Sequence, residues 1–155
     1  MNREPAEPML YFAYGSNMER HHMKRRCRSA KFVAAATLRD YELTFTGTST
    51  VWGGGVADLA PAKGATVEGV LWEITEEDRT ALDEYEGYPK VYVRRNVEVE
   101  TRKGGKVEAF AYFMARPGTY KAPSRRYMQL LVSGAEEHGL SDGYVMRLEA
   151  IKTAG

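Results

Sequence analysis

The sequence predicts an α+β fold in which about six strands form a small barrel, with helices packed outside it. Strand patterns occur mostly as neighbouring pairs separated by turn residues, which is typical of hairpins. Helical patterns occur singly rather than after every strand, so a doubly wound parallel sheet is disfavoured. Because an open sheet would expose its edge strands, a closed or nearly closed barrel is the expected arrangement.

Length and composition are those of a single globular domain. The chain has 155 residues, of which 43% are hydrophobic and 28% charged, and its net charge is +1. No strong field therefore attracts nucleic acid or a membrane surface, and no apolar run approaches the roughly 20 residues of a membrane helix. Residues 1–8 are expected to be a disordered tail and residues 9–155 one domain. Cys27 is the only cysteine, which excludes an internal disulfide and fits a reducing cytoplasm.

The first half of the chain is expected to be mostly strand. Residues 9–14 form an apolar strand, and residues 17–26 follow a Tyr-Gly-Ser-Asn turn as a basic helix. Residues 32–47 form either a strand pair or one long bent strand. Residues 54–74 have the pattern of a hairpin, with turn chemistry at 61–64.

A helix after this hairpin is predicted with both of its ends. Thr75 is a good N-cap, and Asp78 three residues later approximates a capping box. The helix is expected to end near Glu86, because Gly87 can take the left-handed position and Pro89 forbids continuation.

The remaining elements are one more hairpin and two helices. Residues 91–114 form a hairpin with a glycine turn, and an amphipathic helix from 125 stops at 139. A short last helix, capped at 141, runs to 151. The connection at 115–126 is either a lid or a fixed loop.

The usual catalytic and metal-binding patterns are missing. The histidines are His21, His22 and His138, and none accompanies a Gly-x-Ser-x-Gly nucleophile. His21 and His22 with Cys27 make a poor metal set, because adjacent helical residues point about 100° apart. We expect a solvated basic helix face and no metal. That basic run also lacks the interleaved aromatic residues that bind single-stranded nucleic acid.

The turn Tyr14-Gly15-Ser16-Asn17 stands where an apolar strand meets a helix. Gly15 allows a tight turn, after which the amides of Ser16, Asn17 and Met18 would be first-turn donors without helical acceptors. Such a turn can hold a carboxylate or a developing oxyanion. The alternative is that Ser16 or Asn17 simply caps the helix.

Glu86 is the second notable residue, at the predicted C-terminal end of a helix and between two tyrosines. The helix dipole is negative there, and dipole and partial burial both disfavour the carboxylate, so a raised pKa is expected. Such a group suits general acid–base catalysis near neutral pH. The alternative is a solvated terminal carboxylate like Asp83 and Glu84 beside it.

Five segments resemble the γ-glutamylcyclotransferase family in order and spacing: YFAYGSNM, LRDYELTF, GGVADL, VEGVLWEI and LDEYEGYPKVYVRRNVEV. The segment APSRRYMQLLVSGAEEHGLSDGYVMRLEAI is more similar to the family's namesake enzymes than to shorter relatives that share the fold. The resemblance covers residues 10–151. It implies a small mixed β-barrel with helices packed outside, and an activity that releases 5-oxoproline from γ-glutamyl compounds.

The resemblance also implies which residues act. Glu86 would be the carboxylate that transfers protons, and no cofactor would be needed. The substrate's own α-amine would attack its γ-carbonyl, which explains the missing nucleophile, since intramolecular attack already gains from proximity. The substrate-binding residues implied are Tyr14, Gly15, Ser16, Asn17, Met18, Tyr92 and Tyr127.

The expected partner is therefore a small-molecule γ-glutamyl substrate, not nucleic acid or a membrane, and a homodimer is compatible with this interpretation. Two alternatives stay open. One is a relative that acts on a γ-glutamylamine or a γ-glutamyl-bearing secondary metabolite. The other is a non-catalytic small-molecule binding domain on the same fold, in which Glu86 would be dispensable.

Overall fold

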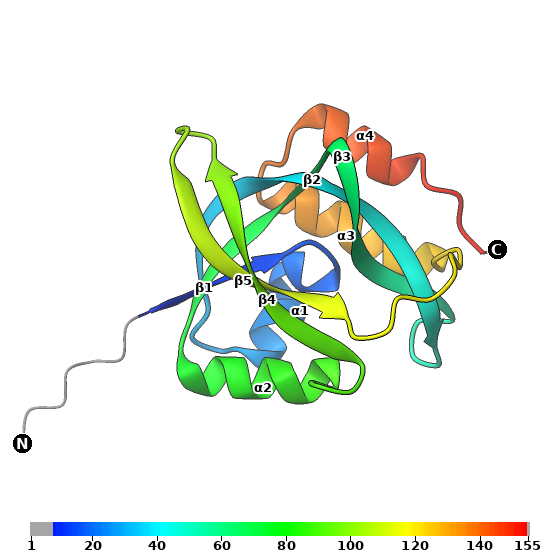
Figure 1. Ribbon diagram of the computed structural model, residues 1–155, viewed down its shortest axis with the longest axis horizontal. Helices are drawn as coiled ribbons and strands as arrows, with labels where there is room; N and C mark the ends of the chain where they lie inside the picture. Colours follow the sequence, from blue (N-terminus) through cyan, green and yellow to red (C-terminus); the bar gives the residue numbers. More distant parts are fainter. Residues whose placement is uncertain (1–7, 155) are drawn as a thin grey trace, which may run out of the picture.

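The computed structural model describes residues 8–154, so the tail expected at 1–8 lies almost wholly outside the described residues. Within this range, strands close into one barrel in the order β1-β3-β2-β4-β5 (Figure 1). The elements are β1 (Met9–Ala13), the 3₁₀ turn η1 (Ser16–Met18), α1 (Arg20–Arg26), β2 (Lys31–Ser49), β3 (Gly54–Ile74), α2 (Glu76–Glu86), β4 (Tyr92–Thr101), β5 (Lys106–Met114), α3 (Arg125–Glu137) and α4 (Asp142–Glu149).

The barrel is mixed, as the sequence predicts. β3 pairs antiparallel with both β1 and β2, and β4 pairs antiparallel with β5. A parallel contact between β1 and β5, at Tyr11 and Phe110, closes one side. The other side closes where Ala36 and Thr37 of β2 meet the end of β4. The expected edge strands are thereby paired, and the α+β barrel with outer helices is confirmed.

The strand count is five in the described range rather than about six, because β3 is one continuous strand. Residues 54–74 were expected to reverse at 61–64, and that prediction is wrong. Arg39 pairs with Thr66 and Tyr41 with Pro61, so residues 62–65 lie opposite Asp40 alone. The turn residues form a bulge in β3 instead of a hairpin. β2, which is itself one long strand, stays paired with β3 on both sides of this bulge.

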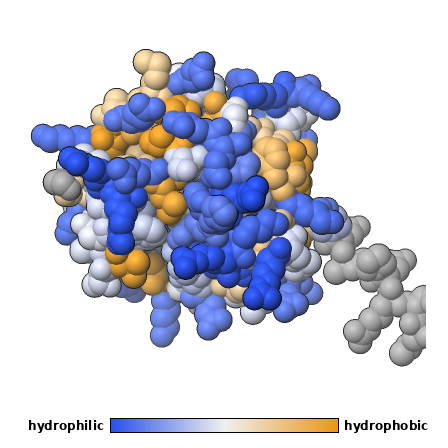
Figure 2. All heavy atoms as spheres, turned by 180° about the vertical axis from the view of Figure 1, so that it is seen from behind, coloured by the Kyte–Doolittle hydropathy of each residue, from blue (hydrophilic) through white to orange (hydrophobic). Residues whose placement is uncertain are grey.

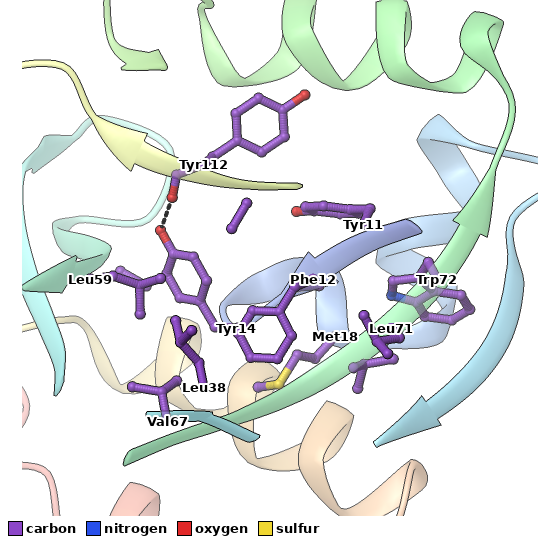
Figure 3. Packing of buried hydrophobic residues seen from close by; sticks show 14 of the residues in the cluster. Tyr11, Phe12, Tyr14, Met18, Leu38, Leu59, Val67, Leu71, Trp72 and Tyr112 are labelled. Atoms are coloured by element: carbon purple, nitrogen blue, oxygen red, sulfur yellow. Dashed lines mark hydrogen bonds between the residues drawn. The ribbon is translucent and has the colours of Figure 1, made fainter. Parts of the chain in front are cut away.

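The barrel and helices enclose one core, which β1 crosses (Figure 3). Phe12, Met18, Leu71 and Trp72 are almost completely buried there. α1 contacts α2 on one side of the barrel, and α3 packs with α4 on another (Figure 1). This arrangement fixes the β1–η1 turn and the end of α2, both of which border the candidate site.

The predicted helix at 17–26 is divided into η1 and α1. Glu19 separates them, and its carboxylate accepts the His22 amide as the N-cap of α1. The basic face of α1 is solvated as expected, since Arg20, His21 and Arg25 are exposed, whereas His22 and Met23 on the other face are buried. Burial, helped by Arg26, lowers the pKa of His22 to about 4, so its ring is neutral at physiological pH.

The surface seen from behind is mainly hydrophilic, with hydrophobic residues gathered in smaller separate patches (Figure 2). None of the helices in residues 8–154 has the length and apolarity needed to cross a membrane.

Candidate active site

A cavity of about 430 Å³ opens where the β1–η1 turn, the β2–β3 loop and the end of α2 meet. Residues from separate parts of the chain line it, and one of them, Glu86, is an acidic residue. The lining consists of Tyr11, Tyr14, Gly15, Ser16, Asn17, Gly47, Thr48, Ser49, Val51, Trp52, Val56, Ala57, Tyr85, Glu86, Gly87, Val91, Tyr92, Met114 and Tyr127.

Two backbone amides of the Tyr-Gly-Ser-Asn turn, both in residues that line the cavity, are free among the described residues. The Met18 amide donates to the Gly15 carbonyl at 3.1 Å, and the Glu19 amide donates to the Ser16 carbonyl at 3.2 Å. The amides of Ser16 and Asn17 have no acceptor among the described residues. The alternative in which Ser16 or Asn17 caps the helix is wrong, because Glu19 is the cap.

Met18 differs from its predicted place. Its amide is bonded within the turn, and its side chain is fully buried in the core beside Phe12 (Figure 3). It does not line the cavity. Met18 therefore packs in the core beneath the turn, whereas Tyr14, Gly15, Ser16 and Asn17 line the cavity, and their roles in substrate binding stay predictions.

Close packing holds the turn in place. The Tyr14 hydroxyl donates to the Tyr112 carbonyl (Figure 3). A β-carbon added at Gly15 would lie 3.2 Å from Ala57 Cβ and 3.3 Å from the Tyr127 hydroxyl. The glycine therefore allows two neighbours to approach the turn more closely than a side chain would permit.

Glu86 stands in the last turn of α2, facing Asn17. The helix ends as the sequence predicts, with Thr75 and Asp78 forming a complete capping box and Gly87 in the left-handed conformation at φ 70°. Asp83, one turn before Glu86, accepts the Tyr112 hydroxyl at 2.6 Å and Arg94 Nε at 3.0 Å. These contacts fix the C-terminal turn of α2 against β4 and β5.

The environment of Glu86 makes it a carboxyl group that titrates near neutral pH. Burial raises its pKa from 4.5 to about 7, while Arg26 and the hydrogen bond from Asn17 act in the opposite direction. Asn17 Nδ2 donates to Glu86 Oε1 at 3.3 Å and to the Tyr11 hydroxyl at 3.0 Å. Glu86 is half-buried on the cavity wall, so it is not the solvated terminal carboxylate of the alternative interpretation.

Two tyrosine hydroxyls bind the backbone of the same residue, Ala57, one as acceptor and the other as donor. The Ala57 amide donates to the Tyr127 hydroxyl at 3.0 Å, and the Tyr92 hydroxyl donates to the Ala57 carbonyl at 2.8 Å. Burial raises the pKa of both phenols well above the ordinary value, so both stay protonated at neutral pH. Tyr127 thus keeps a proton to donate into the cavity, whereas Tyr92 offers its oxygen as an acceptor.

Sequence reasoning missed several lining residues, above all Tyr11, Trp52 and Ala57. Tyr11 reads as an ordinary apolar strand residue, and Ala57 acts through its backbone, which no side-chain pattern reveals. Trp52 lies 5.4 Å from Tyr127, ring centre to ring centre. A detectable signal was the run of glycines after Trp52, because a β-carbon added at Gly55 would lie 2.1 Å from the Lys121 carbonyl oxygen in the 115–126 loop.

The loop at 115–126 is attached to the barrel rather than standing over it. The Lys121 amide donates to the Phe45 carbonyl at 2.8 Å, and the Gly55 amide donates to the Ala122 carbonyl at 3.1 Å. Tyr120 also makes a bridge with Thr46 of β2. Of the two interpretations of this loop, these contacts favour the fixed connection.

Comparisons with known proteins agree on a family. The family model described as "Gamma-glutamyl cyclotransferase, AIG2-like" matches residues 11–129. A protein named Gamma-glutamylcyclotransferase from Homo sapiens is 36% identical over 153 residues, covering 94% of this chain and 80% of that protein. Its namesake from Mus musculus is 35% identical over 156 residues, covering 96% and 81%.

Solved structures give the same result. One titled "Gamma-glutamyl cyclotransferase" superposes with a TM-score of 0.92 at 35% identity, covering 96% of this chain and 90% of the other. On the sequence match over most of its length and on this superposition, the chain belongs to the gamma-glutamyl cyclotransferase, AIG2-like family.

Proposed function

We propose that this protein is a γ-glutamylcyclotransferase, an enzyme that releases 5-oxoproline and a free amino acid or amine from γ-glutamyl compounds. Relatives that match nearly the whole chain are named for that activity. The observation that carries the proposal is a carboxyl group with a pKa of about 7 beside two free amides in one cavity. This pairing suits a reaction that needs proton transfer and oxyanion stabilisation but no protein nucleophile.

The substrate supplies the nucleophile in the proposed reaction. Its α-amine attacks its own γ-carbonyl, a C–N bond forms to close the five-membered ring, and the original amide C–N bond breaks. The amine enters mostly as ammonium, since the pKa of such a group is about 8. Ionised Glu86 takes one proton from the ammonium group and delivers it to the departing nitrogen. The attacking nitrogen loses a second proton on ring closure, and Glu86 passes this proton to the released amine, which leaves as ammonium, so the enzyme ends in its starting state.

The remaining cavity groups match the other charges of the substrate. The amides of Ser16 and Asn17 and the Tyr127 hydroxyl are donors, which suit the substrate carboxylate and the tetrahedral oxyanion. The Tyr92 oxygen is an acceptor, which suits the ammonium group. Holding both ends of the glutamyl group would fold it toward ring closure, where most of the rate gain of an intramolecular reaction arises.

Mass-spectrometric detection of 5-oxoproline tests this proposal. Wild type is incubated with γ-glutamyl amino acids and γ-glutamylamines beside Glu86→Gln and Glu84→Gln, the latter an exposed carboxylate on the same helix. We expect product from wild type and Glu84→Gln, and a loss of about 10²- to 10⁴-fold in kcat/KM for Glu86→Gln. Equal activity of folded Glu86→Gln would remove Glu86 from its role. Absence of product from folded wild type on every substrate would favour a binding domain.

The proposal also includes a cellular location and an oligomeric state. A cytoplasmic location is supported by Cys27, which is a buried free thiol of the kind that persists in a reducing compartment. The homodimer stays a prediction, which sedimentation of the purified protein would test.

A further inference from the structure

The cavity lining divides into a buried floor and an exposed rim. The side chains of Asn17, Tyr92 and Tyr127 on the floor are buried and take part in hydrogen bonds. On the rim, Val51 is 68% exposed and Val91 is 52% exposed. Large apolar side chains that gather at a single opening, beside a polar floor, are typical of a ligand-binding surface.

Arginine side chains support this rim. The Arg126 guanidinium lies 4.9 Å from the centre of the Trp52 ring and donates to the Val51 carbonyl. The Arg26 guanidinium lies 3.3 Å from the centre of the Tyr85 ring. The rim is therefore apolar and aromatic, with positive charge beside it, and it would disfavour a cationic group.

The glutamyl half of the substrate needs the floor, because the floor holds the carboxylate and hydrogen-bond donors that the reaction requires. The scissile nitrogen must lie within reach of Glu86, and whatever is attached to it then extends toward the opening. The departing group would consequently contact Val51, Trp52 and Val91.

We propose that the rim formed by Val51, Trp52 and Val91 selects γ-glutamyl compounds whose departing group has an apolar, uncharged side chain. This inference rests on the proposed function and narrows its substrate class. Burial of an aliphatic side chain against this surface would raise kcat/KM if the contact persists in the transition state. A cationic side chain of similar length would lose that gain and be repelled by the two arginines.

The test compares kcat/KM for γ-glutamyl-glycine, γ-glutamyl-leucine and γ-glutamyl-lysine joined through the lysine α-nitrogen. All three share the reacting γ-glutamyl group. We expect leucine to exceed glycine by at least about fivefold and lysine to fall below leucine by at least about tenfold. Turnover of all three at similar rates would overturn the rim's role and leave the cyclotransferase intact. Turnover of none would overturn both.

A pair of variants assigns the preference to the rim. The double variant Val51→Ser with Val91→Ser is expected to reduce the leucine-to-glycine ratio toward one. Val33→Ser is the matched control, since Val33 is 47% exposed and lies on β2 outside the cavity lining. It is expected to keep the wild-type ratio. A double variant that folds like wild type and keeps that ratio would contradict the proposal.

Discussion

At the scale of single residues, the site depends on how Glu86 is held between opposing influences. Burial favours its neutral form, while the Asn17 amide and the Arg26 charge favour the carboxylate. The balance places its pKa near 7, where a small change of environment alters the ionised fraction most strongly. Asn17 is itself held by the Tyr11 hydroxyl and by Trp72, whose indole donates to the Asn17 carbonyl at 2.9 Å.

The pH dependence of activity should follow this balance. If ionised Glu86 is the form that accepts the proton, kcat/KM falls about tenfold for each pH unit below a pKa of about 7. Asn17→Ala removes a donor that stabilises the carboxylate, so the limb should move to higher pH. Initial rates of 5-oxoproline formation between pH 5 and 9 measure this. An unmoved limb in a folded Asn17→Ala protein would show that Asn17 does not act on Glu86.

Site residues could be predicted where the local sequence identifies them, and could not be predicted where their role depends on residues distant in the sequence. Glu86 and the Gly15 turn follow from local sequence, because a helix end and a strand–turn junction are local features. The donor role of Tyr127 depends on an amide 70 residues away in the sequence, at Ala57. No local pattern encodes such a contact, so it appears only when β3 and α3 are placed together.

At the scale of elements, α2 is the helix that delivers Glu86, and its two ends serve different purposes. The capping box of Thr75 and Asp78 stabilises its start, and Asp78 also accepts the Ser29 hydroxyl at 2.9 Å. The last turn is held by Asp83 through Tyr112 and Arg94. The stability of α2 and the placement of the Glu86 carboxyl group should therefore respond to different substitutions.

Thr75→Ala tests this separation. Loss of the N-cap is expected to destabilise the protein by about 1 kcal/mol and to lower its melting temperature by about 2–4 °C. Because the Asp83 contacts remain, kcat/KM should change less than about twofold. Thermal unfolding and initial rates measure the two effects, with Thr80→Ala as an exposed control on the same helix. A large loss of activity in folded Thr75→Ala protein would show that the two ends are coupled.

Element prediction failed mainly where turn chemistry occurs inside a strand. Pro61 and Gly64 have the residue types of a hairpin turn, yet the chain continues in the same direction. The Gly64 amide donates to the Asp40 carboxylate at 3.0 Å, and Asp40 adopts φ 67° opposite the extra residues. The partner strand absorbs the irregularity, and this long-range pairing cannot be recognised from residues 61–64 alone. By contrast, the N-caps of α2 at Thr75 and of α4 at Ser141 are local and were predicted correctly.

At the scale of the whole molecule, β1 is the barrel strand that closes the sheet between β3 and β5. Its parallel contact with β5 and its antiparallel pairing with β3 place the Tyr-Gly-Ser-Asn turn at the cavity. The same packing holds Glu86 half-buried against the turn. The fold therefore creates the environment of Glu86 at a cost in stability, because a carboxylate is less well solvated there than in the unfolded chain.

That cost should appear as a pH-dependent difference between wild type and Glu86→Gln. The folded pKa of about 7 lies above the ordinary value of 4.5, so the folded protein binds more protons between these values. Wild type therefore loses stability as pH rises from 4.5 to 7, by at most about 3 kcal/mol, whereas the uncharged amide does not. The effect of His22 protonation is common to both proteins and cancels in the difference.

Urea unfolding at several pH values measures this difference, with tryptophan fluorescence and circular dichroism as separate probes. Coincident transitions would also support the expected single domain at 9–155. We expect Glu86→Gln to equal wild type near pH 4.5 and to exceed it by about 1–3 kcal/mol at pH 8, while Glu84→Gln stays close to wild type throughout. A difference that does not vary with pH would mean that folding leaves the pKa of Glu86 unchanged. The cavity would then lack the neutral-pH carboxyl group on which the proposed proton transfer depends.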